Sequence, residues 1–127
     1  MGHKISKRFA FSASHHLPEL PDGHPCARLH GHNYAVEVVV EADRLTGPGF
    51  VTDFGDLAPV KKYLDGTFDH RHLNECMDAP PTSENLAMHL AEWFMTHVEP
   101  AIPRRLAAVR VSETDATWAE YTPDRTP

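Results

Sequence analysis

The segment CARLHGHNY, residues 26–34, places one cysteine, one arginine and two histidines within seven positions. Imidazole nitrogens and thiolate sulfurs are the protein ligands that zinc prefers. On a strand, His30 and His32 lie on one face and can bind the same ion, whereas on a helix they diverge by about 200°. The valine-rich AVEVVV that follows favours a strand. The spacing therefore predicts two metal ligands at the start of a strand over residues 30–42.

A third histidine comes from the preceding segment. Residues 5–13, ISKRFAFSA, alternate with the period-2 pattern of a half-buried strand, and His15 continues the apolar face. Residues 16–29 contain three prolines and one glycine, so they form a long irregular connection. If the two strands pair, His15 lies beside the other two histidines. Three imidazoles leave one zinc position open for water or substrate, which is typical of catalytic sites.

Two other metal sites fit the same residues. Cys26 could be a fourth ligand in a closed structural site, which would make the protein a binding module. Alternatively, His30, His32 and Glu37 look like part of a cupin motif, typical of metal dioxygenases and isomerases. Glu37 has odd parity on the expected strand and faces away from the two histidines, which argues against the cupin. The histidines could also be polar residues at strand ends with no metal role.

Composition restricts the class of protein. A length of 127 residues predicts one domain over residues 1–127. The formal charge of −6 argues against nucleic acid as a partner. No apolar run reaches the length of a membrane helix, and the N-terminus lacks the apolar region of a signal peptide, so we expect a cytoplasmic protein. Cys76 has no histidine nearby and is interpreted as structural, since two cysteines do not make a disulfide framework.

Together with the two strands described above, the remaining segments give the order ββααββ. Helical spacing predicts a first helix over residues 56–66 with Asp56 as its cap. A stronger apolar stripe predicts a second helix over residues 82–98, capped by Thr82 or Ser83. This order predicts an α+β domain in which two helices cover one face of a mainly antiparallel sheet. The other expected segments are a short extension or edge piece over residues 49–54, strands over residues 105–113 and 117–121, and a frayed tail over residues 122–127.

Five motifs, FSASHHLP, GHPCARLHGHNY, DHRHLN, PTSENLA and VSET, occur in this order over about residues 7–121. They resemble the 6-pyruvoyltetrahydropterin synthase superfamily and, within it, the bacterial 6-carboxy-5,6,7,8-tetrahydropterin synthases that make 7-deazaguanine precursors, for example for queuosine. The C-x3-H-G-H spacing resembles the carboxy-forming members. The resemblance implies the tunnelling fold, or T-fold, in which subunits join into an oligomeric β-barrel. It implies typically a homohexamer, with active sites at the subunit interfaces.

The resemblance also implies roles for individual residues. Cys26 matches a catalytic thiol rather than a fourth ligand, and Asp69 with His70 resembles a proton-relay pair. Glu113 matches the carboxylate that anchors the pterin through two parallel donors, the 2-amino group and N3–H. The implied zinc (Zn²⁺) ligands are His15, His30 and His32.

Further contacts to substrate are expected from basic and hydroxyl residues. Arg28 and Lys7 match basic positions of the family and are candidates for binding triphosphate. Thr82 and Ser83 could donate hydrogen bonds to the pterin, although capping the second helix explains them equally well. Weaker phosphate candidates are Arg8, His16 and His24, while His72 is interpreted as structural.

The implied activity is a zinc-dependent lyase with no redox cofactor. It would convert 7,8-dihydroneopterin 3′-triphosphate to 6-carboxy-5,6,7,8-tetrahydropterin and release acetaldehyde and triphosphate. Two alternatives stay open at this point. One is a pyruvoyl-forming triphosphate lyase, or a member that only cleaves the side chain of related pterins. The other is a zinc- or pterin-binding module without turnover.

Overall fold

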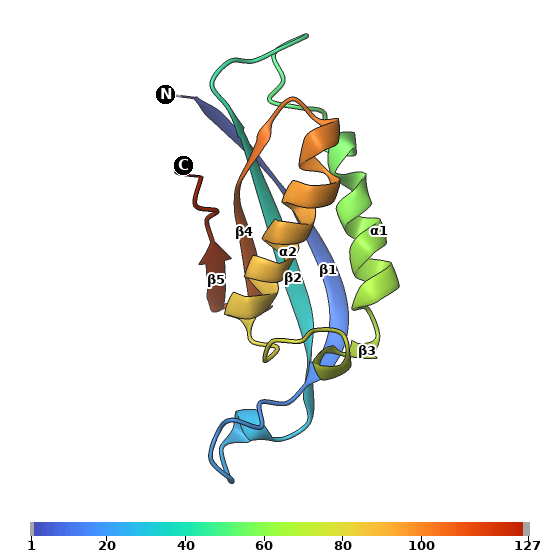
Figure 1. The fold of residues 1–127 in the computed structure, drawn as a ribbon, viewed down its shortest axis with the longest axis vertical. Coiled ribbons are helices and arrows are strands. Elements are labelled where there is room, and N and C mark those ends of the chain that lie inside the picture. Colours follow the sequence, from blue (N-terminus) through green and yellow to red (C-terminus); the bar gives the residue numbers. More distant parts are fainter. Residues whose placement is uncertain (1, 126–127) are drawn as a thin grey trace.

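A computed structural model describes residues 2–125, in which a five-stranded sheet carries two helices on one face (Figure 1). The strands lie in the order β3–β1–β2–β4–β5, with β3 parallel to β1 and the other neighbours antiparallel. The predicted α+β class and the order ββααββ are confirmed, and β3 is an addition between the helices. The elements are β1 His3–His15, β2 His30–Ala42, α1 Ala58–Thr67, β3 Arg71–His72, α2 Ser83–His97, β4 Arg105–Thr114 and β5 Thr117–Tyr121.

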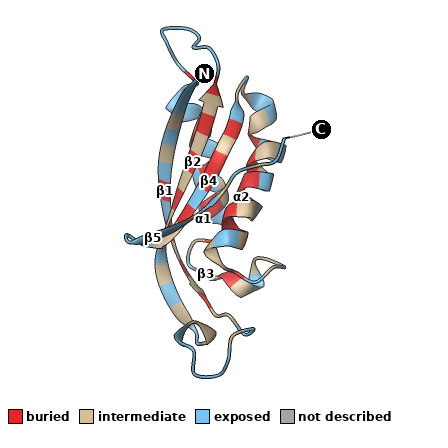
Figure 2. Cartoon of the chain, turned by 90° about the vertical axis from the view of Figure 1, so that its left-hand side faces the viewer, coloured by how far each residue is buried: buried red, intermediate tan, exposed pale blue. Residues whose placement is uncertain are grey.

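One face of the sheet is buried and the other is not. Alternate residues of β1 and β2 point toward the helices, and Figure 2 shows the resulting alternation of buried and exposed positions along the strands. Helix α2 packs on β4 and β5, while α1 lies against β1. The core on this face includes Phe9, Phe11, Tyr34, Val36, Val38, Val109 and Val111.

The two helices begin in different ways. The Thr82 hydroxyl accepts a hydrogen bond of 3.1 Å from the Asn85 amide, so the predicted cap of α2 is confirmed. The predicted cap of α1 is wrong, because α1 begins after Leu57 and no side chain caps it. Asp56 instead accepts a hydrogen bond from the Thr52 hydroxyl in the preceding 3-10 turn.

Three connections complete the fold. Residues 16–29 are irregular apart from a short 3-10 helix, Pro25–Ala27. The edge piece expected over residues 49–54 is reduced to one bridge between Thr46 and Phe50. In the segment expected to fray, Arg125 donates to both carboxylate oxygens of Glu99 at 2.7 Å, and residues 126–127 lie outside the described part. Among residues 2–125, no helix is both long and apolar enough to cross a membrane.

Candidate metal centre and active site

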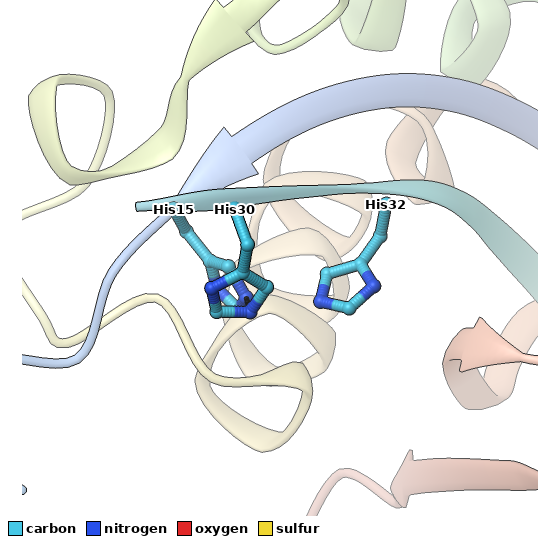
Figure 3. Close-up of side chains that lie close together, drawn as sticks. All are labelled: His15, His30 and His32. Atoms are coloured by element: carbon cyan, nitrogen blue, oxygen red, sulfur yellow. Dashed lines mark hydrogen bonds between the residues drawn. The ribbon is translucent and has the colours of Figure 1, made fainter. Parts of the chain in front are cut away.

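The pairing of β1 with β2 brings three histidines to one end of the sheet. His15 lies opposite His30 and Ala13 lies opposite His32, so all three imidazoles project from the face that the helices cover. One nitrogen from each ring lies within 4.8 Å of the other two. Figure 3 shows the three rings projecting from the same side of the strands, with the His15 and His30 rings closest together. Strand phase alone thus predicted this convergence.

Hydrogen bonds fix the tautomers of two of these histidines. The Nδ1 of His15 lies 2.8 Å from the Pro81 carbonyl oxygen, and the Nδ1 of His30 lies 2.6 Å from the Arg28 carbonyl oxygen. A carbonyl only accepts, so both Nδ1 atoms donate, and each ring in its neutral form presents an Nε2 lone pair. These two Nε2 atoms are 3.0 Å apart. Two lone pairs at that distance repel unless a cation or a proton lies between them.

The spacing suits a metal ion. Two nitrogens bound to one tetrahedral zinc at about 2.05 Å are about 3.3 Å apart, close to the observed distance. Carbonyl oxygens that accept from the far ring nitrogen are the usual outer support of metal-binding histidines. Burial lowers the pKa of His15, against the opposing effect of the Pro81 hydrogen bond, and this favours the neutral ring that a metal requires. The donor set therefore fits a divalent transition metal.

His32 has a free ring nitrogen, and the described residues supply no fourth ligand to the cluster. The Nε2 of His32 is buried and has no hydrogen-bond partner among residues 2–125. Within the described chain no cysteine, aspartate or glutamate joins the three imidazoles as a fourth ligand. A metal held here would keep one position for a small molecule, as catalytic zinc sites do.

Glu113 lies beside this cluster at the end of β4. One carboxylate oxygen is 3.5 Å from the Nε2 of His32, and the other accepts a 3.1 Å hydrogen bond from the hydroxyl of Ser83, the first residue of α2. The carboxylate is thus held by the first residue of α2 and lies beside the three-histidine cluster. Thr82, by contrast, is already engaged in capping α2.

Tyr34 adds a buried polar group that sequence reasoning missed. Its ring stacks on Phe11 at 5.0 Å and meets His15 and His32 edge-on at 6.0 and 5.5 Å. Its hydroxyl is buried without a hydrogen-bond partner in the described chain. Burial, and secondly the charge of Glu113, raises the pKa of the Tyr34 phenol, so the group is a neutral donor. Tyr34 is two residues from His32 and so shares its strand face, but nothing in the sequence indicates that its hydroxyl lacks a partner.

The family sequence pattern described as 6-pyruvoyl tetrahydropterin synthase matches residues 4–124. The chain belongs to this family. The superfamily resemblance inferred from the five motifs is thereby confirmed.

Proteins similar to this chain have several names. A 6-carboxy-5,6,7,8-tetrahydropterin synthase from Synechocystis is 37% identical over 123 residues, which is 92% of this chain and 91% of that protein. A dihydroneopterin monophosphate aldolase from Pyrococcus furiosus is 45% identical over 67 residues, which is 50% of this chain and 54% of that protein. The solved Caenorhabditis elegans 6-pyruvoyl tetrahydropterin synthase superposes with a TM-score of 0.82 at 25% identity, covering 98% of this chain and 97% of that one.

Two residues that the family motifs single out lie in the connection before β2. The Cys26 carbonyl accepts a 2.9 Å hydrogen bond from the Leu17 amide, which ties this connection to the end of β1. The Cys26 thiol is half-buried and does not join the histidine cluster, so a closed four-ligand site is not formed within the chain. The Arg28 side chain is exposed and forms no ion pair with residues 2–125.

Asp69 and His70 form a pair at the edge of β1. One Asp69 oxygen accepts from the Ser12 amide at 3.0 Å, and the other lies 2.9 Å from the Nδ1 of His70. The Ser12 hydrogen bond, with His70 second, holds the pKa of Asp69 below its usual value. His70 has a left-handed backbone, φ 58°, and its amide donates to the Ser12 carbonyl. The pair is assembled, but it does not join the three-histidine cluster.

Lys7 lies away from the cluster. Its ammonium donates to the Phe54 carbonyl at 3.3 Å, and along β1 Lys7 lies eight residue steps, about 26 Å, from His15. Within one chain the structure therefore does not bring Lys7 to the histidines.

The remaining candidates have local partners. The Nδ1 of His24 accepts from the Cys26 amide at 3.1 Å. His16 and His72 are hydrogen-bonded to each other at 3.0 Å, and His72 also meets the Ser14 hydroxyl at 2.9 Å. Arg8 lines a small cavity with Glu37 and Arg110. These contacts account for His16, His24 and His72 without a ligand.

Proposed function

We propose that this chain is a zinc-dependent lyase that converts 7,8-dihydroneopterin 3′-triphosphate to 6-carboxy-5,6,7,8-tetrahydropterin, with release of acetaldehyde and triphosphate. The observation that carries the proposal is the open three-histidine cluster with a carboxylate 3.5 Å from one of its rings. The name of the Synechocystis relative, which aligns over most of both chains, supports the choice of reaction.

Zinc would be held by His15, His30 and His32, since one ring nitrogen of each lies within 4.8 Å of the other two. Bound there, it would supply Lewis-acid polarisation to the substrate side chain and stabilise developing negative charge. His15 is buried and His30 and His32 are half-buried, and this partial exclusion of water would strengthen the charge interactions at the cluster.

Glu113 would anchor the pterin ring. The pterin presents two parallel donors, N3–H and the 2-amino group, and one carboxylate can accept both. Ser83 occupies a lone pair on one oxygen and so holds the carboxylate plane. The anchor thereby places the ring, and hence its side chain, beside the metal position.

Proton transfer would fall to Cys26, Asp69 and His70. Cys26 would act as the general base on the side chain, and the Asp69 carboxylate would orient the His70 imidazole and stabilise its charged form. Because the Ser12 amide keeps Asp69 ionised, the pair is ready for that role at neutral pH.

The site would be completed between subunits. Cys26, the Asp69–His70 pair and Lys7 lie apart from the histidine cluster within one chain. A homohexamer with active sites at its interfaces would bring these groups together from neighbouring copies. Arg28 and Lys7 would then provide positive charge for the triphosphate.

Product analysis tests the proposed reaction. Zinc-loaded protein incubated with the triphosphate should yield acetaldehyde and a carboxypterin. No external oxidant is required, because the carbon that becomes the carboxyl is oxidised while the ring and the departing two-carbon unit are reduced. A pyruvoyl product without acetaldehyde would contradict the proposal.

A second candidate is cleavage of the side chain alone. The local 45% identity to a dihydroneopterin monophosphate aldolase favours it. A retro-aldol reaction would leave a hydroxymethyl group on the ring and release a two-carbon hydroxyaldehyde with its phosphate groups. The same incubation distinguishes this outcome, since the pterin would then carry no carboxyl group. Glu113→Gln should weaken either reaction, whereas His72→Ala, outside the cluster, serves as the matched control.

A further inference from the structure

Tyr34 is the one phenol among the described residues whose hydroxyl is fully buried and unpaired. Tyr34 as a whole is 1% exposed. A buried hydroxyl without a partner destabilises a folded protein by a few kcal/mol. Phenylalanine would fill the same space against Phe11 without that penalty, so the oxygen calls for an explanation.

The position of the hydroxyl supplies one. Strand β2 pairs with β4 through Ala35–Ser112 and Val36–Val111. Continued by one residue, this register would place Tyr34 opposite Glu113, on the face that carries His32. A phenol donates one hydrogen bond, and a carboxylate has about four acceptor positions on its two oxygens.

The described contacts of Glu113 leave room for this donor. Ser83 uses one acceptor position, and the other oxygen lies 3.5 Å from His32 without a hydrogen bond from it. A pterin would take one position on each oxygen. A fourth position remains, and Tyr34 is the neighbouring unpaired donor.

We propose that Tyr34 is a positioning residue whose hydroxyl donates to Glu113, directly or through one buried water, when the carboxylate pairs with an amidine-type donor edge such as that of a pterin. The inference rests on the proposed function, because it assumes that Glu113 binds the ring. Under this proposal Glu113 and Tyr34 together select ligands by their donor edge, although Tyr34 does not contact the ligand.

Tyr63 provides a matched control. Its hydroxyl lies 2.7 Å from the Nε2 of His89 between the two helices, so it is a phenol with a partner and outside the site. Tyr34→Phe should leave the midpoint of thermal unfolding of the ligand-free protein unchanged or higher, because it removes an unpaired oxygen. Tyr63→Phe should lower that midpoint, because it leaves His89 without its partner.

Calorimetric binding of neopterin tests the role, with pteridine-2,4-dione as the ligand that lacks the 2-amino donor. Tyr34→Phe should raise the neopterin Kd about tenfold, change the dione Kd little, and leave zinc content unchanged. Tyr63→Phe should leave both dissociation constants unchanged. In a Glu113→Gln background, Tyr34→Phe should have no further effect on neopterin, since it acts through the carboxylate.

The outcomes separate two failures. If Glu113→Gln does not weaken neopterin binding, the proposed anchor is wrong and the proposed function loses its support. If Glu113→Gln weakens binding but Tyr34→Phe does not, the function stands and the role of Tyr34 is overturned. Equal losses for both ligands, or a lower unfolding midpoint in ligand-free Tyr34→Phe, would also overturn it by indicating a structural hydroxyl.

Discussion

Zinc should stabilise the folded chain through the three-histidine cluster, and His32→Ala should remove that stabilisation. His32 is the informative position because its Nε2 makes no hydrogen bond, whereas replacing His15 would also break a 2.8 Å bond to Pro81. At a free zinc concentration one hundred times Kd, linkage adds about 2.7 kcal/mol to the free energy of unfolding. With an unfolding entropy of about 2.1 cal/mol/K per residue, the 127 residues give a rise in Tm of about 10 °C.

Scanning calorimetry of metal-free protein, with and without zinc at one protomer concentration, measures this shift. His72→Ala is the matched control, since His72 bonds to Ser14 and His16 outside the cluster. It should keep the full shift, while His32→Ala should lose most of it. Zinc binding by the three histidines is contradicted if the wild-type Tm does not respond to zinc, or if the Tm of His32→Ala responds as strongly as that of the control.

Three further predictions concern the thiol, a helix cap and acid stability. Cys26→Ala should retain zinc in metal analysis and lose at least about a hundredfold in product formation, as for removal of a general base; loss of the metal instead would make Cys26 a ligand. Thr82→Ala removes the 3.1 Å cap bond to Asn85 and should lower the free energy of unfolding by about 1 kcal/mol in denaturant melts; an unchanged midpoint would contradict the capping role. Burial lowers the pKa of His89 below 6.5 in the folded state, so the unfolded chain binds more protons and stability should fall as pH drops below 6.5. His89→Gln should flatten that decline in melts recorded at several pH values. An equally steep loss of stability in the variant would show that His89 is not its cause.

The strands of the site could be predicted because strand phase is a local property. Alternation over residues 5–13 and the valines after His32 were enough to place three histidines on one face. Strand β3 could not be predicted, because two residues carry no period and Arg71–His72 pairs only through its contact with β1. The Asp56 cap failed for a similar reason: a 3-10 turn delayed the start of α1 by two residues.

Much of the chemistry around the histidines depends on contacts that side-chain spacing does not reveal. The carbonyls that fix two imidazole tautomers belong to Pro81 and Arg28, and backbone acceptors leave no signature in side-chain spacing. The Ser83 bond to Glu113 joins residues thirty positions apart. Likewise, an unpaired hydroxyl such as that of Tyr34 is defined by what is absent around it, which only three-dimensional packing reveals.

A crystal structure of the zinc-loaded protein with a bound pterin, using anomalous scattering to locate the metal, would show whether the three histidines hold zinc beside the pterin anchor. We expect one zinc with the Nε2 atoms of His15, His30 and His32 at about 2.0–2.1 Å. We also expect the donor edge of the ring on the carboxylate of Glu113. A zinc bound through Cys26 as a fourth ligand, or a pterin seated away from Glu113, would contradict this arrangement.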